Sequence, residues 1–145
     1  MIIFTVEQRS FFDRQRVGHL ATADAAGHPH VVPVCYVAAD DVVYIALDAK
    51  SKRVGWQDLK RVRNVMENSH VALVIDRYTE EWQHLAYMLI RGTAALLPPD
   101  TAEQQHAVTL LRARYPQYQA MPIDTQPVVA IRPQSVVAWG DILGE

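Results

Sequence analysis

Hydrophobic residues in this chain gather in short runs rich in β-branched and aromatic side chains, and polar turn sequences separate the runs. Runs of this kind predict β-strands. Gly27, which can adopt positive φ, lies in the turn after the first run, and Asp40 and Asp41 make the next turn. The first three strands are therefore predicted to form an antiparallel meander. The runs cover residues 17–24, 29–37, 42–47, 70–76, 85–97 and 127–139, the last being one strand or a strand pair interrupted by Pro133.

Three helices are predicted beside these strands. Thr5 and Gln8 have the spacing of a capping box, which predicts a helix start. Proline is tolerated in a first helical turn, so Pro98 and Pro99 can open the third helix. The predicted helices run to about Arg16, from about Arg53 to Glu67, and from Pro98 to a point before Pro116, and residues 116–126 are predicted to be an irregular loop.

The number of strands and the length of the chain together predict the fold class. About six strands with short helices, in 145 residues of which 50% are hydrophobic, predict one mainly β domain over residues 1–145. A six-stranded antiparallel barrel, closed or nearly closed, would remove exposed strand edges. An open sheet backed by helices is the alternative.

Composition narrows the class of partner. The net charge of −2 argues against a dedicated nucleic-acid binder. No apolar run approaches the roughly 20 residues that a bilayer crossing needs, and the N-terminus lacks a basic lead and a long apolar core. The single cysteine, Cys35, excludes an internal disulfide and is predicted to be a buried, inert thiol. We therefore expect a cytoplasmic protein that contacts neither membrane nor nucleic acid.

A local basic cluster stands out against this slightly acidic background. Asp58 is the only acid between positions 50 and 63. Lysine and arginine donors at a strand-to-helix junction suit a phosphate group, although a solvated helix face is the alternative. The six basic residues are Lys50, Lys52, Arg53, Lys60, Arg61 and Arg63.

Several segments, taken in chain order, carry a resemblance. They are HLAT (19–22), GHPHVVPV (27–34), DVVYIA (41–46), KSKR (50–53), RNVMEN (63–68), VIDRY (74–78), EW (81–82), IRGTA (90–94), IRP (131–133) and WG (139–140). This ordered series resembles the pyridoxamine-5′-phosphate-oxidase-like split barrels, and most closely the branch described as deazaflavin (coenzyme F420)-dependent oxidoreductases. The resemblance covers nearly the whole chain.

The resemblance implies a homodimeric split β-barrel with FMN or F420 bound at the subunit interface. Hydride transfer to a small organic acceptor would then belong to the cofactor, and the chain needs no nucleophile–base constellation of its own. The positions that the resemblance assigns to the cofactor are Val32, Pro33 and Val34 along the ring, Ile45 and Ala46 beneath it, Lys50, Ser51, Lys52 and Arg53 at its phosphate, and Trp139 as a terminal aromatic that reaches the site across the dimer.

Some alternatives stay open at this point. The C-terminal arginine and histidine set of the pyridoxamine phosphate oxidases proper is not found, so vitamin B6 oxidation is not predicted. The second class of function is a non-catalytic flavin or haem carrier on the same barrel. Tyr78, Trp82 and Tyr87 wall a substrate pocket or pack a dimer interface. His28 and His30 are interpreted as structural, because no further ligand completes a metal site.

Overall fold

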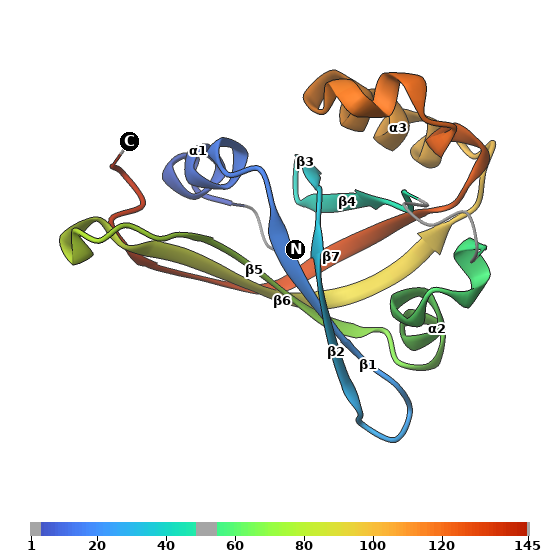
Figure 1. Cartoon of the computed structure of the whole chain (residues 1–145), viewed down its shortest axis with the longest axis horizontal. Helices are drawn as coiled ribbons and strands as arrows, with labels where there is room; N and C mark the ends of the chain where they lie inside the picture. The colour runs from blue at the N-terminus through green and yellow to red at the C-terminus, as the bar shows by residue number, and fades with distance from the viewer. Residues whose placement is uncertain (1–3, 49–54, 145) are drawn as a thin grey trace.

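The computed structural model describes residues 4–48 and 55–144, and Figure 1 shows their arrangement. The strands are β1 (Gly18–Ala23), β2 (Pro29–Val34), β3 (Val37–Ala39), β4 (Val42–Ala46), β5 (His70–Arg77), β6 (Ala86–Leu97) and β7 (Val128–Gly140). The α-helices are α1 (Val6–Arg14), α2 (Lys60–Glu67) and α3 (Ala102–Arg114), and the short 3-10 helices are η1 (Trp56–Asp58), η2 (Trp82–His84), η3 (Pro116–Ala120) and η4 (Ile123–Thr125).

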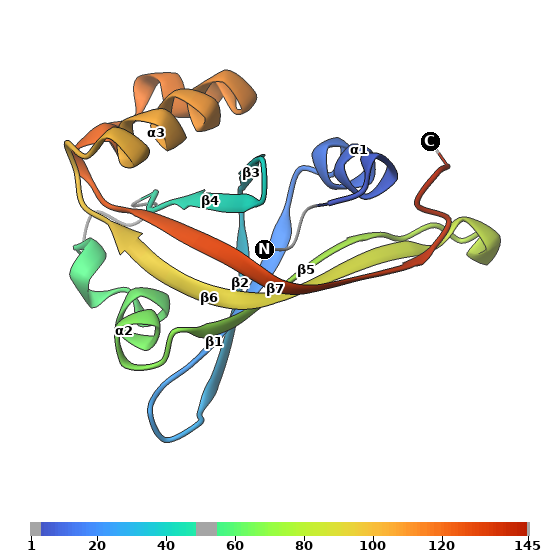
Figure 2. The same cartoon turned by 180° about the vertical axis from the view of Figure 1, so that it is seen from behind.

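The seven strands form one antiparallel sheet that curls strongly, as both Figure 1 and Figure 2 show. Their order is β2-β1-β5-β6-β7-β4-β3. Strands β2 and β3 stand at opposite ends of this order, yet only Cys35 and Tyr36 separate them in sequence. The sheet must therefore turn back on itself to bring its two ends together. The predicted mainly β barrel is confirmed, with seven strands in place of six.

The extra strand arises at Tyr36, where the predicted second strand breaks. The Tyr36 ring is fully buried, and its hydroxyl donates to the carbonyl oxygens of Phe12 at 2.6 Å and Gln15 at 2.8 Å. Its backbone N–H donates to the Tyr115 hydroxyl at 3.1 Å. Because this N–H is paired with a side chain, β2 ends before it. The predicted three-strand meander is wrong at this point, since β4 pairs with β3 and β7 and has no ladder with β2.

Strands β6 and β7 form a long ribbon that passes through Pro133 without a break. Gly92 pairs with Pro133 and Arg91 with Ser135, so Gln134 is an extra residue at a β-bulge. A bulge accommodates a residue that has no N–H to donate. A Cβ atom on Gly92 would collide with the Arg132 carbonyl. The final segment is therefore one strand, not a pair.

Helix α1 follows its predicted start, whereas α2 and α3 begin later than predicted, α3 at Ala102 with Thr101 as its N-cap and not at Pro98. The Thr5–Gln8 capping box is present, and each of its two hydrogen bonds measures 3.0 Å. Helix α2 begins at Lys60 and not near Arg53, because Leu59 has extended backbone angles (φ −66°, ψ 131°) and η1 precedes it. Arg53 itself lies outside the described residues. Residues 116–126 contain η3 and η4, so the predicted irregular loop is partly helical.

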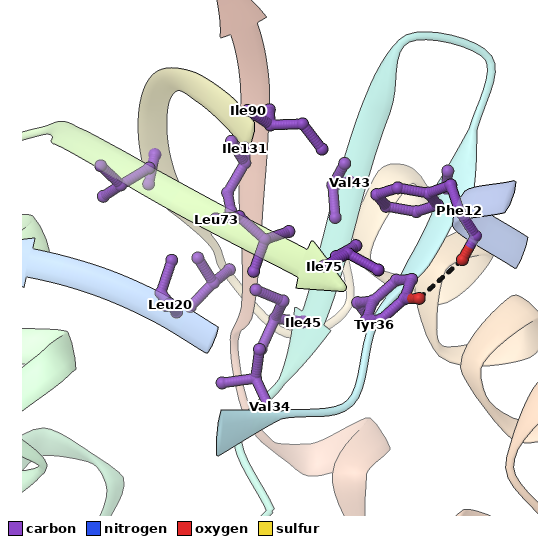
Figure 3. Close-up of a cluster of buried hydrophobic side chains, with 14 of the residues drawn as sticks. Phe12, Leu20, Val34, Tyr36, Val43, Ile45, Leu73, Ile75, Ile90 and Ile131 are labelled. Atoms are coloured by element: carbon purple, nitrogen blue, oxygen red, sulfur yellow. Dashed lines mark hydrogen bonds between the residues drawn. The ribbon is translucent and has the colours of Figure 1, made fainter. Parts of the chain in front are cut away.

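The core has two parts, one on each face of the curled sheet. Ile45, Leu73 and Ile90 belong to the cluster inside the curl, which Figure 3 shows together with Tyr36 bonded to Phe12. Tyr44 and Leu111 belong to a second cluster between the outer face of the sheet and α3. Every residue of β4 is buried because both of its faces are covered. In the described part of the chain, no helix has the length and apolar character needed to span a membrane.

Candidate functional site

The predicted phosphate site lies where β4 ends and α2 begins. Lys50, Ser51, Lys52 and Arg53 fall outside the described residues. The described side chains that flank this segment are Asp48 before it and Arg61 after it. These two side chains bring one positive and one negative charge to the junction.

Arg61 is the described basic residue that turns toward this junction. Its side chain is only 15% exposed, and its Nη2 atom lies 3.9 Å from Asp48 Oδ1. Its Nε atom is buried, and no residue of the described ranges accepts a hydrogen bond from it. A buried guanidinium with one distant partner is incompletely compensated. The arrangement fits a planar anionic ligand, because a guanidinium can donate two parallel hydrogen bonds to one phosphate.

Lys60 and Arg63, the neighbouring members of the basic cluster, point elsewhere. Lys60 Nζ lies 3.6 Å from Asp24 Oδ2 in the β1–β2 turn, and Arg63 is exposed. Asp24 Oδ1 accepts the backbone N–H of His28 at 2.9 Å. This hydrogen bond, with a smaller contribution from the His28 side chain, lowers the pKa of Asp24 to about 2. The predicted basic face is thus divided among three directions, and of these three residues only Arg61 pairs with Asp48.

The predicted ring-lining residues occupy the end of β2. Val32 is half-buried, Pro33 is exposed and Val34 is buried within the inner cluster. Because β2 stands at one end of the strand order, its outer backbone edge has no strand partner among the described residues. Free backbone groups on such an edge can bond a ligand. The assignment of these residues to a cofactor stays a prediction.

Ile45 and Ala46 lie on opposite faces of β4. Ile45 joins the inner cluster and is 1% exposed, while Ala46 joins the outer cluster and is 3% exposed. Successive strand residues point to opposite faces, so only one of the two side chains can face any given ligand. The prediction that both pack beneath a cofactor is untested, and their side chains leave almost no surface in a single chain.

Trp139 lies far from the other predicted positions. It pairs with Tyr87 near one end of the β6–β7 ribbon, whereas Val128, at the other end, pairs with Ala46. Eleven residues at about 3.3 Å each separate Trp139 from Val128, roughly 35 Å along an unbent strand. The Trp139 ring stacks on Tyr87 at 5.6 Å and is 52% exposed. Within one chain, therefore, Trp139 and Ala46 lie near opposite ends of the β6–β7 ribbon.

Exposed aromatic residues surround Trp139. Tyr78 is 64% exposed and Trp82 is 70% exposed at the β5–β6 turn. Tyr78, Tyr87 and Trp139 line a shallow groove of about 410 Å³. Exposed apolar patches of this kind mark interaction sites.

A second hollow lies beside the phosphate junction, and sequence reasoning missed it. This cavity of about 460 Å³ is lined by Cys35, Asp48, Met121 and the Tyr115–Tyr118 segment. Cys35 is half-buried and borders the cavity, so its predicted full burial is wrong. The one sequence signal for this cavity was the position of Asp48 directly after an apolar strand. Tyr118 belongs to the segment predicted as an irregular loop, and Tyr115 directly precedes that segment.

No metal centre is formed by the described residues, where no three histidine, cysteine or acidic side chains lie close enough to share an ion. His28 Nδ1 lies 3.0 Å from Asp24 Oδ2, within the β1–β2 turn.

Comparison with known proteins gives a consistent picture. Residues 4–140 match the sequence model of the pyridoxamine 5′-phosphate oxidase family. A 5a,11a-dehydrotetracycline/5a,11a-dehydrooxytetracycline reductase from Streptomyces rimosus is 26% identical over 138 residues, covering 94% of this chain and 83% of that protein.

Solved structures share the fold at low sequence identity. A conserved hypothetical protein from Mycobacterium tuberculosis superposes with a TM-score of 0.73 and 19% identity, covering 100% of this chain and 90% of that one. The haem storage protein HutZ from Vibrio cholerae gives 0.71 and 14%, with 94% of each chain covered. An FAD-binding protein from Mesorhizobium loti gives 0.68 and 20%, covering 94% of this chain and 95% of that one.

Proposed function

This chain belongs to the pyridoxamine 5′-phosphate oxidase family, and from that premise we propose that it is a flavin- or deazaflavin-dependent oxidoreductase acting on a small organic acceptor. The observation that carries the proposal is the family match over residues 4–140. The reductase from Streptomyces rimosus, similar over most of both chains, supports the choice of oxidoreductase.

The described residues fit the phosphate of such a cofactor. The buried Nε of Arg61 has no acceptor among the described residues, and its guanidinium lies 3.9 Å from Asp48, which precedes the predicted contacts Lys50, Lys52 and Arg53 in sequence. A phosphate would supply the missing acceptor and compensate the buried charge. The unpaired edge of β2, with Val32 and Pro33, would face the cofactor's polar ring edge.

The protein's other role would be to position the bound cofactor. The bound cofactor would supply hydride chemistry, and the protein would orient the ring and keep water away from it. FMN and F420 both carry a phosphate, so Arg61 and the lysine-rich segment suit either one.

We infer a homodimer for the same site. Trp139 lies roughly 35 Å along the ribbon from the strand that holds Ala46. If Trp139 contributes to the cofactor site, a second copy must supply it. The exposed aromatic residues around it provide surface for that contact.

The experiment that tests the proposal is a parallel titration of the purified protein with FMN and with F420, followed by fluorescence. Micromolar or tighter binding of one cofactor supports the proposal and selects between the two. Lys52→Ala should weaken that binding markedly and leave the folded state unchanged. Lys60→Ala is the matched control, because its ammonium group is engaged by Asp24. Binding of neither cofactor would remove the basis for a redox enzyme.

A second measurement separates an enzyme from a carrier. An enzyme should reoxidise its bound reduced cofactor faster on addition of an acceptor than the same cofactor reacts free in solution. Equal rates would favour the alternative of a non-catalytic flavin or haem carrier.

A further inference from the structure

The cavity lined by Cys35, Asp48 and the Tyr115–Tyr118 segment has walls that are held in place by hydrogen bonds. The Arg112 guanidinium donates to the carbonyl oxygens of Tyr118 at 3.0 Å and Met121 at 2.9 Å, and so fixes η3 against α3. Tyr115 and Tyr118 meet edge to face at 5.6 Å. A volume of about 460 Å³ is within the range of roughly 300–1,000 Å³ typical of small-molecule sites.

The hydrogen-bonding capacity of this cavity is strongly one-sided. The Tyr118 hydroxyl donates to Asp48 Oδ2 at 2.8 Å, so its proton is already committed. Burial, reinforced by the Asp48 carboxylate, raises the pKa of Tyr118, and the hydroxyl therefore keeps that proton. The Tyr115 hydroxyl is occupied as well, donating to the carbonyl oxygens of Arg16 at 2.9 Å and Tyr36 at 3.0 Å.

What remains for a ligand is a set of acceptors. The Asp48 carboxylate retains accepting capacity, and the Tyr118 oxygen has free lone pairs. Among the described residues that line the cavity, the side-chain donors that remain are the amide of Gln117, which is exposed, and the weak S–H donor of Cys35. An anionic ligand group beside Asp48 Oδ2, the oxygen that Tyr118 bonds, would meet like charge, whereas the Arg61 guanidinium lies 3.9 Å from the other oxygen, Oδ1.

We propose that this cavity binds the acceptor substrate of the oxidoreductase, and that it selects an apolar, ring-shaped molecule carrying a hydroxyl or amine donor that hydrogen-bonds to Asp48. Asp48 and Tyr118 are substrate-positioning residues in this assignment. The inference rests on the proposed function, because only a redox enzyme has an acceptor.

The location of the cavity relates it to the proposed cofactor site. Cys35 directly follows the predicted ring-lining residues 32–34, and Asp48 directly precedes residues 49–54. Two residues that line the cavity are thus next in sequence to the segments assigned to the cofactor. The two proposed ligands would be distinguished by charge. Arg61 suits the cofactor phosphate, and Asp48 suits the hydrogen-bond donor of the acceptor substrate.

Three matched probes test the selectivity without any cofactor. 2-Naphthol carries one hydroxyl donor, 2-methoxynaphthalene has none, and 2-naphthoate is an anion. A hydrogen bond to a charged acceptor is worth about 1.5–3 kcal/mol, so 2-naphthol should bind about tenfold or more tighter than 2-methoxynaphthalene. 2-Naphthoate should bind worst of the three. Calorimetry on the full chain measures all three dissociation constants.

The single cysteine reports where the probes bind. Cys35 borders the cavity and is the only thiol of the chain, so bound 2-naphthol should slow its alkylation by a maleimide. Asp48→Asn replaces a pure acceptor by an amide that also donates, and should reduce the 2-naphthol preference to about threefold or less while improving 2-naphthoate. Asp58→Asn, which makes the same change of charge at an exposed residue, is the control.

Each outcome decides the assignment. Equal binding of 2-naphthol and 2-methoxynaphthalene, unprotected Cys35, or an unchanged preference in Asp48→Asn would overturn it. Displacement of 2-naphthol by FMN or F420 would also overturn it, because the cavity would then be the cofactor's own site. If 2-naphthol protects Cys35 and Asp48→Asn removes the preference while neither cofactor binds, the donor-selective cavity stands and the proposed function fails.

Discussion

Replacing Arg61 by alanine should separate the stability of the protein from its affinity for the cofactor. The guanidinium is 15% exposed, and its ion-pair partner among the described residues is Asp48, at 3.9 Å. Removing the guanidinium leaves the Asp48 carboxylate, which is 12% exposed, without this cation, and breaking a buried pair in this way is destabilising. Asp48 keeps its hydrogen bond from Tyr118. Because the pair is long, we expect the free energy of unfolding to fall by less than the roughly 3–5 kcal/mol that breaking a close buried pair costs.

The effect on cofactor binding should depend on the cofactor's phosphate. A charge-assisted hydrogen bond is worth about 1.5–3 kcal/mol, which corresponds to roughly a 10- to 150-fold weaker dissociation constant for FMN. Riboflavin has the same ring and no phosphate, so its binding should change by less than about threefold. Fluorescence titrations of both ligands at low and moderate salt measure the difference, and urea unfolding measures stability.

Arg63→Ala is the matched control, because Arg63 lies on the same helix and is exposed. Removal of a screened surface charge should weaken FMN binding by less than about threefold. Two results would refute the reasoning. One is an FMN affinity that falls equally in Arg61→Ala and Arg63→Ala, and the other is a riboflavin affinity that falls as much as that of FMN.

Two further predictions concern acid stability and assembly. The folded-state pKa of Asp24 is lowered from 3.8 to about 2, so its contribution to stability is complete above about pH 4 and is lost as the pH falls toward 2. Asp24→Asn should remove this part of the pH dependence, which urea midpoints between pH 5 and pH 2 would measure, and an unchanged dependence would contradict the assignment. Trp139→Ala should weaken a dimer by about 30-fold if this half-exposed ring is an interface anchor worth about 2 kcal/mol, whereas Val6→Ala, at an exposed residue of α1, should not. Sedimentation across a concentration series decides this, and a parent that is monomeric at every concentration would exclude the dimer.

Local sequence features determined most of the secondary structure because each depends on neighbouring residues alone. The capping box needs only Thr5 and Gln8, and the first turn needs only Gly27, which indeed has φ of 86°. Strand β4 was predictable from its continuous apolar run. That run reflects burial on both faces, which the sequence records even though the partners lie elsewhere in the chain.

Features that depend on distant partners were decided by the tertiary structure. Tyr36 ends β2 only because the Tyr115 hydroxyl accepts its N–H, and Pro133 stays within β7 only because a bulge opposite Gly92 accommodates it. Neither partner is recognisable from local sequence. Helix propensity likewise could not place the start of α2 at Lys60.

Some features of the candidate site could likewise be predicted from the sequence, and others depend on the tertiary structure. The sequence alone identified a basic segment at a strand-to-helix junction and, through resemblance, the positions assigned to a cofactor. Only the curled sheet decided that Arg61 faces Asp48 while Lys60 faces Asp24. The proposed donor-selective cavity depends on Asp48 and Tyr118, which are 70 positions apart. They meet because the sheet closes and α3 folds back over it. Residue type fixes what a side chain can bond, and long-range packing fixes which partner it meets.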